Sequence, residues 1–405
     1  MSDPSVRAAQ IARTSYGRLL AILAARTRDI SAAEDALSDA FATALARWPE
    51  TGIPQNPEAW LVTTARNKLT DQMRRAVRVQ FTDEVPEEAP EMYVETPSSL
   101  PDHRLALMLV CAHPALDPKL HAPLMLQTVL GFEAVDIARV FAMPASALAQ
   151  RLVRAKRKIK DAGISFALPE AEALEARLAP VLAAIYAAYT IDWMDAPTGS
   201  APLREEALYL ADLIAQLVPR SAEALGLAAL LTYSIAREPA RIIEGRLVAL
   251  PDQDHALWDE DLSERAEILL ARASRLNQIG RYQLEAAIQA VHMARRVTGE
   301  PDWRAIRQLT TGLMQVAPSQ GAAVALAAAT MEDLGTAAGL TALDRLSETC
   351  GNFQPYWATR AEALHRIGRL EDALAANAEA RRLAASDLIK DWLEARDAKW
   401  RAALN

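Results

Sequence analysis

The sequence contains few of the residues that mark β-rich or disulfide-linked proteins. Among 405 residues there are only 15 glycines, 6 phenylalanines and 2 cysteines. The cysteines, Cys111 and Cys350, are 239 positions apart, and we find neither a signal peptide nor an apolar run of membrane-spanning length. These absences predict a soluble cytoplasmic protein with reduced thiols and no membrane contact.

The residues that are abundant favour helices. Hydrophobic residues make up 51% of the chain and charged residues 24%, which is typical of a globular protein with a large core. Alanine, leucine, glutamate and arginine, all good helix formers, are used heavily. The sequence therefore predicts an all-α fold, and its length predicts about two to four domains.

The net charge of −8 hides an uneven distribution along the chain. Residues 1–163 carry 20 basic and 19 acidic side chains, whereas residues 164–405 carry 24 basic and 33 acidic ones. Within the first part, residues 82–102 contain 7 acidic side chains and no basic ones. Any contact with nucleic acid is therefore expected to be local and confined to the N-terminal part.

Residues 133–160 have the pattern of two helices joined by a turn. A short helix signal is followed by Ala142, Met143 and Pro144, and then by the longer segment SALAQRLVRAKRKIK. Apolar residues in that segment recur at helical spacing on one face, and Arg151, Arg154 and Lys158 recur on another. This predicts a helix-turn-helix in which the second helix enters a DNA major groove, although a solvated basic helix is the simpler alternative.

Two further helices are predicted near the N-terminus. Ser31 and Glu34 form a capping-box pattern before a helix over residues 32–48, and Pro49 is expected to end that helix and open a loop to Asn56. Asn56 and Pro57 then start a second helix, whose core face is predicted to comprise Val62, Ala65, Leu69 and Met73.

The remainder divides into a linker and a helical region. Residues 82–102 are acidic and contain four prolines, which predicts a flexible tether. Beyond Gly163 the chain is alanine-rich, and residues 357–380 have the spacing of a tetratricopeptide helix pair. Gly280 and Gly368 are in similar local sequences but are 88 residues apart, so a degenerate solenoid is expected.

Taken together and in order, the segments AAEDALSDAFATALARW, PEAWLVTTARNKLTDQMRR and QRLVRAKRKIK resemble bacterial RNA polymerase sigma factors of the extracytoplasmic-function type. The resemblance covers residues 5–163, and the remainder is similar to members with a C-terminal tetratricopeptide-like extension. It implies four parts: a sigma region 2-like domain (1–81), an acidic linker (82–102), a sigma region 4-like helix-turn-helix domain (103–163) and a TPR-like domain (164–405).

The resemblance also implies roles for individual residues. Residues matching the surface that binds the beta-prime clamp helices of core RNA polymerase are Asp35, Leu37, Asp39 and Phe41. Residues matching the reader of the minus-ten element are Thr51, Gln55, Asn56, Arg66, Asn67, Lys68, Arg74 and Arg75. Residues matching the reader of the minus-thirty-five element are Ser146, Gln150, Arg151, Arg154, Arg157 and Lys158. A contact of the region 4-like domain with the beta flap is implied as well.

Two departures from the family pattern affect promoter choice. Ala149 stands where lysine is common, and Pro54 lies in the loop that is expected to capture a flipped base. The promoter sequence therefore does not transfer from relatives.

Other candidate sites are weaker. His103, Cys111, His113 and His121 include zinc-ligand types but lack the usual ligand spacing, so a core thiol and surface imidazoles are the favoured interpretation. Five tryptophans (193, 258, 303, 357 and 392) fit core packing better than a ligand groove. No catalytic set or cofactor motif is found, so an enzyme is not expected.

The sequence thus predicts a sigma factor whose C-terminal domain regulates it in cis, through an intramolecular contact or a regulatory protein. The alternative is a sigma-derived scaffold that binds only protein.

Overall fold

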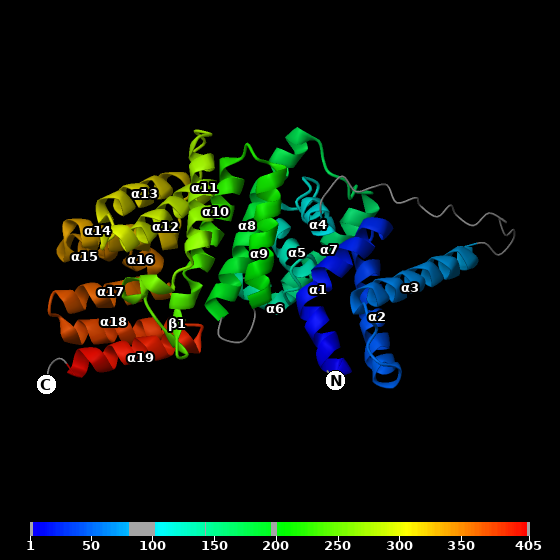
Figure 1. Ribbon diagram of the computed structural model, residues 1–405, viewed down its shortest axis with the longest axis horizontal. Helices are drawn as coiled ribbons and strands as arrows, with labels where there is room; N and C mark the ends of the chain where they lie inside the picture. The colour runs from blue at the N-terminus through cyan, green and yellow to red at the C-terminus, as the bar shows by residue number, and fades with distance from the viewer. Residues whose placement is uncertain (1–2, 81–101, 142, 196–200, 403–405) are drawn as a thin grey trace. The chain divides into compact units, whose positions relative to one another are not determined.

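The computed structural model describes residues 3–80, 102–141, 143–195 and 201–402, and it divides into two compact units, residues 1–188 and 189–405 (Figure 1). The described residues are helical except for short connections and one small hairpin, which confirms the predicted all-α class. The two units divide inside one helix, whereas the sequence-based boundary at 163/164 precedes that helix. Each unit is described by itself.

The first unit contains seven helices among its described residues and most of an eighth. They are α1 (Pro4–Thr27), α2 (Ile30–Thr51), α3 (Pro57–Gln80), α4 (His103–Cys111), α5 (Pro118–Thr128), α6 (Ala134–Val140), α7 (Ala145–Asp161) and α8 (Ala171–Asp195). Helices α6 and α7 occur where the sequence predicts them. Of the predicted turn between them, Ala142 lies outside the described residues, as does the proposed tether from 82 to 101.

The start of α2 differs from the predicted capping box. Asp29 caps the helix, because its Oδ1 accepts a hydrogen bond from Ala32 N at 3.0 Å. Pro49 does not end the helix but lies in its last turn. The helix instead ends at Gly52, whose φ of +84° favours glycine, so the loop is shorter than expected.

The start of α3 confirms the predicted cap. The Oδ1 of Asn56 accepts a hydrogen bond from Ala59 N at 3.1 Å, and Pro57 is the first helical residue. Ala65 and Leu69 are buried as predicted, but Leu61 is fully buried in place of Val62, which is half-buried. The side chain of Met73 lies outside the described residues.

Helix α8 corrects the expectation that the chain has no apolar run of membrane-spanning length. Residues 171–191 are long and apolar enough to cross a membrane, with a mean hydropathy of 1.2, and half of that stretch is buried in the structure. Val181 and Ile185 are fully buried, and the Arg177 guanidinium donates to the carbonyl of Leu109 at 3.2 Å. The stretch therefore forms part of a protein core.

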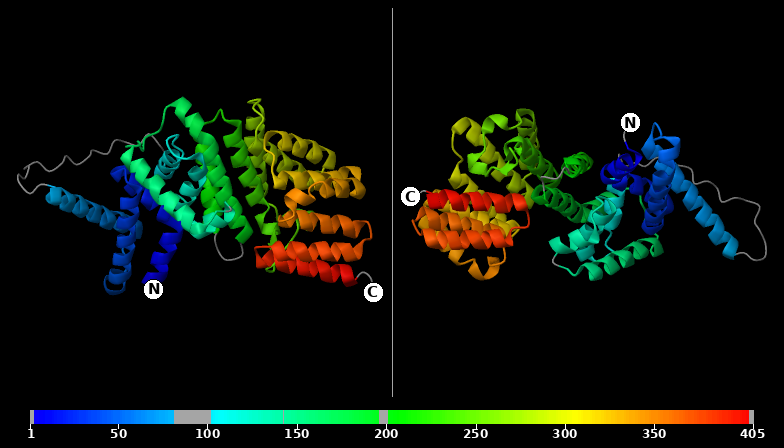
Figure 2. Two further views of the ribbon diagram at one scale, coloured as in Figure 1. Left: turned by 180° about the vertical axis from the view of Figure 1, so that it is seen from behind. Right: turned by 90° about the horizontal axis from the view of Figure 1, so that it is seen from below.

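The second unit continues as a series of antiparallel helices (Figure 2). They are α9 (Ala201–Leu217), α10 (Ala222–Ala236), α11 (Glu260–Ser274), α12 (Arg281–Thr298), α13 (Trp303–Val316), α14 (Gln320–Leu334), α15 (Thr336–Asp344), α16 (Ser347–Cys350), α17 (Gln354–Arg366), α18 (Leu370–Leu383) and α19 (Asp387–Ala402). The tightest pairs are α10 with α11 and α12, and α17 with α18.

The residues between α10 and α11 form the main irregular segment of this unit. Strands β1 (Ile242–Ile243) and β2 (Arg246–Leu247) form an antiparallel hairpin, and short 3₁₀ turns lie at 238–240, 250–252 and 255–257. Glu244 and Gly245 both have positive φ, at 51° and 75°, as the tightest hairpin turn requires. Sequence periodicity missed this hairpin because each strand has only two residues.

The two glycine-containing helix pairs are not equivalent. Gly368 separates α17 from α18 with a φ of +79°, whereas Gly280 caps α12 in an extended conformation with a φ of −141°. The similarity of their local sequences therefore does not correspond to one repeated turn geometry. A tetratricopeptide-like origin of this unit remains a prediction.

Gly226 allows α10 and α12 to approach at the level of their backbones. A Cβ atom on Gly226 would lie 2.5 Å from Gln283 N and 2.8 Å from Gln283 Cα. We expect Gly226→Ala to lower the free energy of unfolding by about 2 kcal/mol, because the clash outweighs the better helix propensity of alanine. Urea denaturation measures the free energy of unfolding. Gly312→Ala is the control, because a Cβ atom at Gly312 would lie 3.8 Å from the Leu284 side chain, an ordinary van der Waals distance. Equal stability of the two variants would contradict this packing.

His292 makes the stability of the second unit depend on pH. Burial, and then the charges of Arg237 and Arg295, lower the pKa of His292 to about 4. Between that value and the unfolded pKa the unfolded chain binds more protons, so stability is lost as the pH falls from about 6.5 to about 4. We expect wild type to lose up to about 3 kcal/mol more than His292→Gln over this range. Denaturation of wild type and His292→Gln at about pH 6.5 and about pH 4 tests this prediction. Equal losses of stability in the two proteins would refute it.

Candidate nucleic-acid interface

Helix α7 separates its apolar and basic residues onto different faces. Leu148, Leu152, Ala155 and Ile159 are at most 5% exposed, as the sequence pattern predicts. The exposed side comprises all the residues predicted to face DNA, namely Ser146, Gln150, Arg151, Arg154, Arg157 and Lys158. One of them is already paired, because Arg157 lies 3.4 Å from Asp161 in the next turn. The others form a solvated surface that can accommodate a polyanion.

A shallow groove of about 370 Å³ runs beside α7. Arg151, Arg154 and Lys158 line one side, and Leu116 and Leu120 line the other. Among the described residues that line the groove, Asp117 is the one carboxylate, and it already accepts a hydrogen bond from Lys119 N at 3.0 Å as the cap of α5. The groove is therefore electropositive, which suits phosphate groups.

The predicted reader of the minus-ten element occupies the end of α2 and the exposed side of α3. Gln55 and Asn56 lie in the loop and are exposed, whereas Thr51 belongs to α2 and donates to the carbonyl of Arg47 at 3.0 Å. On α3, Asn67 and Arg74 are exposed, Arg66 and Lys68 are half-buried, and the side chain of Arg75 lies outside the described residues. The rings of Trp48 and Trp60, on either side of the loop in the sequence, pack edge to face with their centroids 5.6 Å apart.

The predicted polymerase-binding residues do not share one surface. Asp35 and Asp39 are exposed on α2 and Phe41 is half-buried, but Leu37 is fully buried and belongs to the core. Leu37 is buried because it follows the same helical face as Ala40, Ala44 and Trp48, and its assignment to the polymerase surface came from the resemblance alone. Asp39 also forms an ion pair with Lys68 of α3 at 3.1 Å. The two residues thus link the expected protein-binding and DNA-binding surfaces.

The buried position of Lys156 was not predicted from the sequence. It lies among the basic residues of α7 but is only 7% exposed, and its Nζ is 2.5 Å from the Oε1 of Glu34 on α2. Lys160, one turn later, pairs with Asp29 at 2.8 Å, and this contact raises the pKa of Lys160. Two of the six basic residues of α7 thus serve an internal contact, which residue type alone does not indicate.

The histidines and cysteine that the sequence offers as zinc ligands do not form a metal site. Among the described residues, no group of three His, Cys, Asp or Glu side chains could hold a metal ion. Cys111 is buried, and burial raises the pKa of its thiol to about 12. His121 is also buried, not at the surface as expected, because it follows Leu120 on the inner face of α5. Burial lowers its pKa, so it stays neutral near pH 7.

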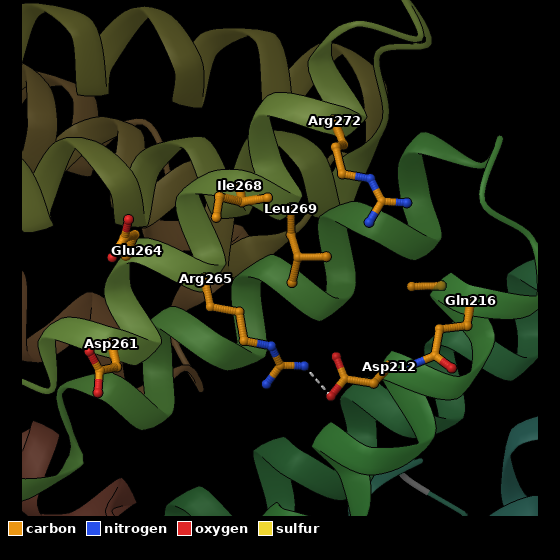
Figure 3. Close-up of a pocket in the computed structure, with 9 residues that line it drawn as sticks. Asp212, Gln216, Asp261, Glu264, Arg265, Ile268, Leu269 and Arg272 are labelled. Carbon is orange, nitrogen blue, oxygen red and sulfur yellow. Dashed lines mark hydrogen bonds and ion pairs between the residues drawn. The ribbon is translucent and has the colours of Figure 1, made fainter.

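The second unit contains a groove of about 460 Å³ between α9 and α11 (Figure 3). An Arg265–Asp212 ion pair crosses it, and Ile268 is 55% exposed at its edge. The tryptophans are mainly core residues, as expected: Trp258 is 4% exposed, and Trp303, Trp357 and Trp392 are half-buried. The side chain of Trp193 lies outside the described residues.

Comparison with known proteins identifies the class of the N-terminal helices. Residues 11–79, which comprise most of α1 and nearly all of α2 and α3, match Sigma-70 region 2. This match supports a sigma factor, a class of protein that binds RNA polymerase. Residues 177–274 match a family of unknown function, DUF6596, and include the groove between α9 and α11.

The similarity to one relative extends over most of the chain. An uncharacterized protein, R00370, of Rhizobium meliloti (strain 1021) is 34% identical over 359 residues, which are 85% of this chain and 84% of the relative. The chain belongs to the same family as this protein. No solved structure matches the chain.

Proposed function

We propose that the chain is a promoter-specificity sigma factor of the extracytoplasmic-function type. It binds core RNA polymerase through α2 and reads the minus-ten element with the loop after α2 and with α3. It reads the minus-thirty-five element with α7. The match of residues 11–79 to Sigma-70 region 2 is the observation that carries this proposal.

The exposed face of α7 supports the second half of the proposal. Its exposed cations and the groove beside it suit the phosphate backbone, and the exposed Ser146 and Gln150 near its start can offer polar groups to base edges. The position of α7, downstream of region 2 and beyond an acidic segment of suitable length, agrees with the order of domains that the sequence resemblance implies.

The second unit is proposed to regulate this activity in cis in the cytoplasm. Its acidic composition favours attraction to basic surfaces, and attraction of that kind weakens as salt is added. The groove between α9 and α11 is the candidate site for a regulatory protein, because it combines charged residues with the exposed Ile268.

The alternative is a sigma-derived scaffold without promoter activity. Size-exclusion chromatography of the full chain with purified core RNA polymerase tests the first step of the proposal. We expect a stable complex that a housekeeping sigma factor displaces competitively, because both use the same polymerase surface. Failure to form the complex, or a complex that a housekeeping sigma factor does not displace, would favour the scaffold.

A further inference from the structure

Three arginines are buried in the second unit, where the segment between α10 and α11 meets α12. Arg237 follows the last residue of α10, Arg241 follows the first 3₁₀ turn, and Arg295 belongs to α12. Helices α10, α11 and α12 pack against one another (Figure 1). Each arginine is between 5% and 8% exposed, although arginine is rarely buried without a charged partner. These three residues are called the arginine cluster below.

The charges of Arg237 and Arg295 are not balanced by carboxylates. The Nη2 of Arg237 donates to the Oε1 of Gln289 at 2.7 Å, and the Nη2 of Arg295 donates to the carbonyl of Leu250. Both acceptors are uncharged, and neither arginine forms an ion pair with a carboxylate that the structure describes. Burial, together with the charges of Arg295 and Arg241, lowers the pKa of Arg237 to about 10. Arg237 therefore still carries its charge at pH 7, close to other positive charges.

Two carboxylates near the cluster do not supply the missing charge. Glu238, the residue after Arg237, pairs with Arg204 at 2.8 Å, so its charge is already matched. Asp252 favours the charged form of Arg295, but burial has the larger effect and lowers the pKa of Arg295. A buried charge without compensation is costly, so a negative charge from outside the chain would stabilise this region.

Buried donors of the same region also lack acceptors. Among the described residues, the buried atoms without a hydrogen-bond partner include the Nε of Arg237, the Nε of Arg295, the Nε1 of Trp258 and the Nδ1 of His292. A neutral imidazole can carry its proton on Nδ1, so all four atoms can donate. Folded proteins leave few buried donors unpaired, and several in one region indicate a ligand rich in acceptors.

Aromatic rings hold these side chains in place. The guanidinium carbon of Arg295 lies 5.0 Å from the centroid of the Trp258 ring, which is 4% exposed. The rings of His292 and Trp303 pack edge to face, with their centroids 5.5 Å apart. The side chains are thus positioned without a ligand, and this raises the affinity for one, because less conformational entropy is lost on binding.

We propose that the arginine cluster binds one small tetrahedral oxyanion, of the size and charge of inorganic phosphate, through the guanidinium groups of Arg237 and Arg295 and the indole N–H of Trp258. These donors come from the end of α10, from α12 and from the residues before α11. Donors on three separate elements suit a tetrahedral anion better than a planar carboxylate. The proposal goes beyond the proposed function and does not depend on it.

The burial of the cluster limits the size of the anion. The small exposed fractions of the arginines let an ion reach them from solvent but leave little room for a substituent. A free anion, and not a phosphomonoester, is therefore the expected ligand. Because Arg295 also holds the carbonyl of Leu250, a bound anion would fasten the segment between α10 and α11 to α12. The stability of the second unit would then increase with the anion concentration.

Isothermal titration calorimetry of the full chain at constant ionic strength tests the binding. We expect inorganic phosphate to bind one saturable site per chain and sulfate, which is also tetrahedral, to compete with it. Acetate should not compete, and glycerol phosphate should bind at least about tenfold more weakly. Absence of a saturable site for phosphate, or equal binding of glycerol phosphate, overturns the proposal.

Replacement of neighbouring arginines on α12 locates the site. Arg295→Gln should weaken phosphate binding at least about tenfold, because a charge-assisted hydrogen bond is lost. Arg296→Gln is the matched control, since Arg296 is the next residue of the same helix, is exposed and pairs with Glu260. This control should bind phosphate as wild type does. Unchanged binding by Arg295→Gln, or an equal loss in Arg296→Gln, places the bound phosphate elsewhere and overturns the proposal.

The sign of a stability change separates an anion site from a purely structural arginine. Without phosphate, Arg237→Met should raise the urea midpoint, because it removes an unbalanced buried charge and keeps an apolar stem. Phosphate should raise the midpoint of wild type and of Arg296→Gln more than that of Arg237→Met. A lower midpoint for Arg237→Met, or an equal effect of phosphate on all three proteins, contradicts the proposal. If Arg237→Met does not fold, the titration of Arg295→Gln decides.

Discussion

Replacing Arg151 and Arg154 together by glutamate is expected to lower promoter-dependent transcription by about 100-fold while leaving the affinity for core RNA polymerase unchanged. Both guanidinium groups are exposed on α7 and line the groove beside it, and neither forms an ion pair with a carboxylate in the part of the chain that the structure describes. Reversal of two charges replaces two attractive phosphate contacts by repulsive ones. The loss should therefore appear in DNA binding and not in assembly of the holoenzyme.

The alanine version of the same pair gives a quantitative test. Loss of two phosphate contacts should flatten the slope of log affinity against log salt by about two units. Arg272→Ala with Arg275→Ala, two exposed arginines at the end of α11, is the matched control, because it changes the net charge equally but lies outside the proposed interface. Equal slopes for the two double variants would exclude Arg151 and Arg154 from the DNA interface.

Asp35→Arg is expected to weaken binding of core RNA polymerase by about 10- to 100-fold, since charge reversal at a desolvated contact costs several kcal/mol. Asp35 is exposed on α2 and forms no ion pair with any described residue, whereas Asp39 is paired with Lys68, so Asp35 gives the cleaner test. The measurement is a competition titration with a labelled housekeeping sigma factor.

The control for that experiment is Glu50→Arg, at the exposed far end of the same helix. It reverses the same charge but lies outside the predicted polymerase-binding surface. Thermal unfolding should show both variants folded. If Asp35→Arg and Glu50→Arg bind polymerase equally well, the surface of α2 that binds polymerase does not include Asp35.

Helix periodicity was sufficient to predict the helices that carry the candidate site. In α7 the periodicity separates an apolar face from a mainly basic one, so the buried apolar residues and the exposed residues predicted to face DNA could both be assigned from the sequence. The Asn56 cap of α3 could be predicted for the same reason: its chemistry is local and needs only the next three residues.

Long-range contacts could not be predicted in this way. Lys156 has the same residue type and nearly the same helical position as its exposed neighbours, and only the presence of Glu34 on another helix makes it a buried residue. Such assignments depend on which helix packs against which face.

The division of the chain also depends on contacts between distant segments. A cut at 163/164 follows the change in composition, but Arg177 of α8 donates to the Leu109 carbonyl of α4 within the first unit. Deleting residues 170–405 would therefore also remove part of the first unit's core. A truncation that tests regulation in cis should retain α8, because otherwise a loss of activity would report unfolding.

Transcription with purified components tests the central claim most directly. The full chain and core RNA polymerase are incubated with fragmented genomic DNA of the source organism, and transcript 5′ ends are mapped with and without the chain. We predict chain-dependent transcripts whose starts share common sequences near minus ten and minus thirty-five. A folded chain that produces no start beyond those of core polymerase alone would contradict the account.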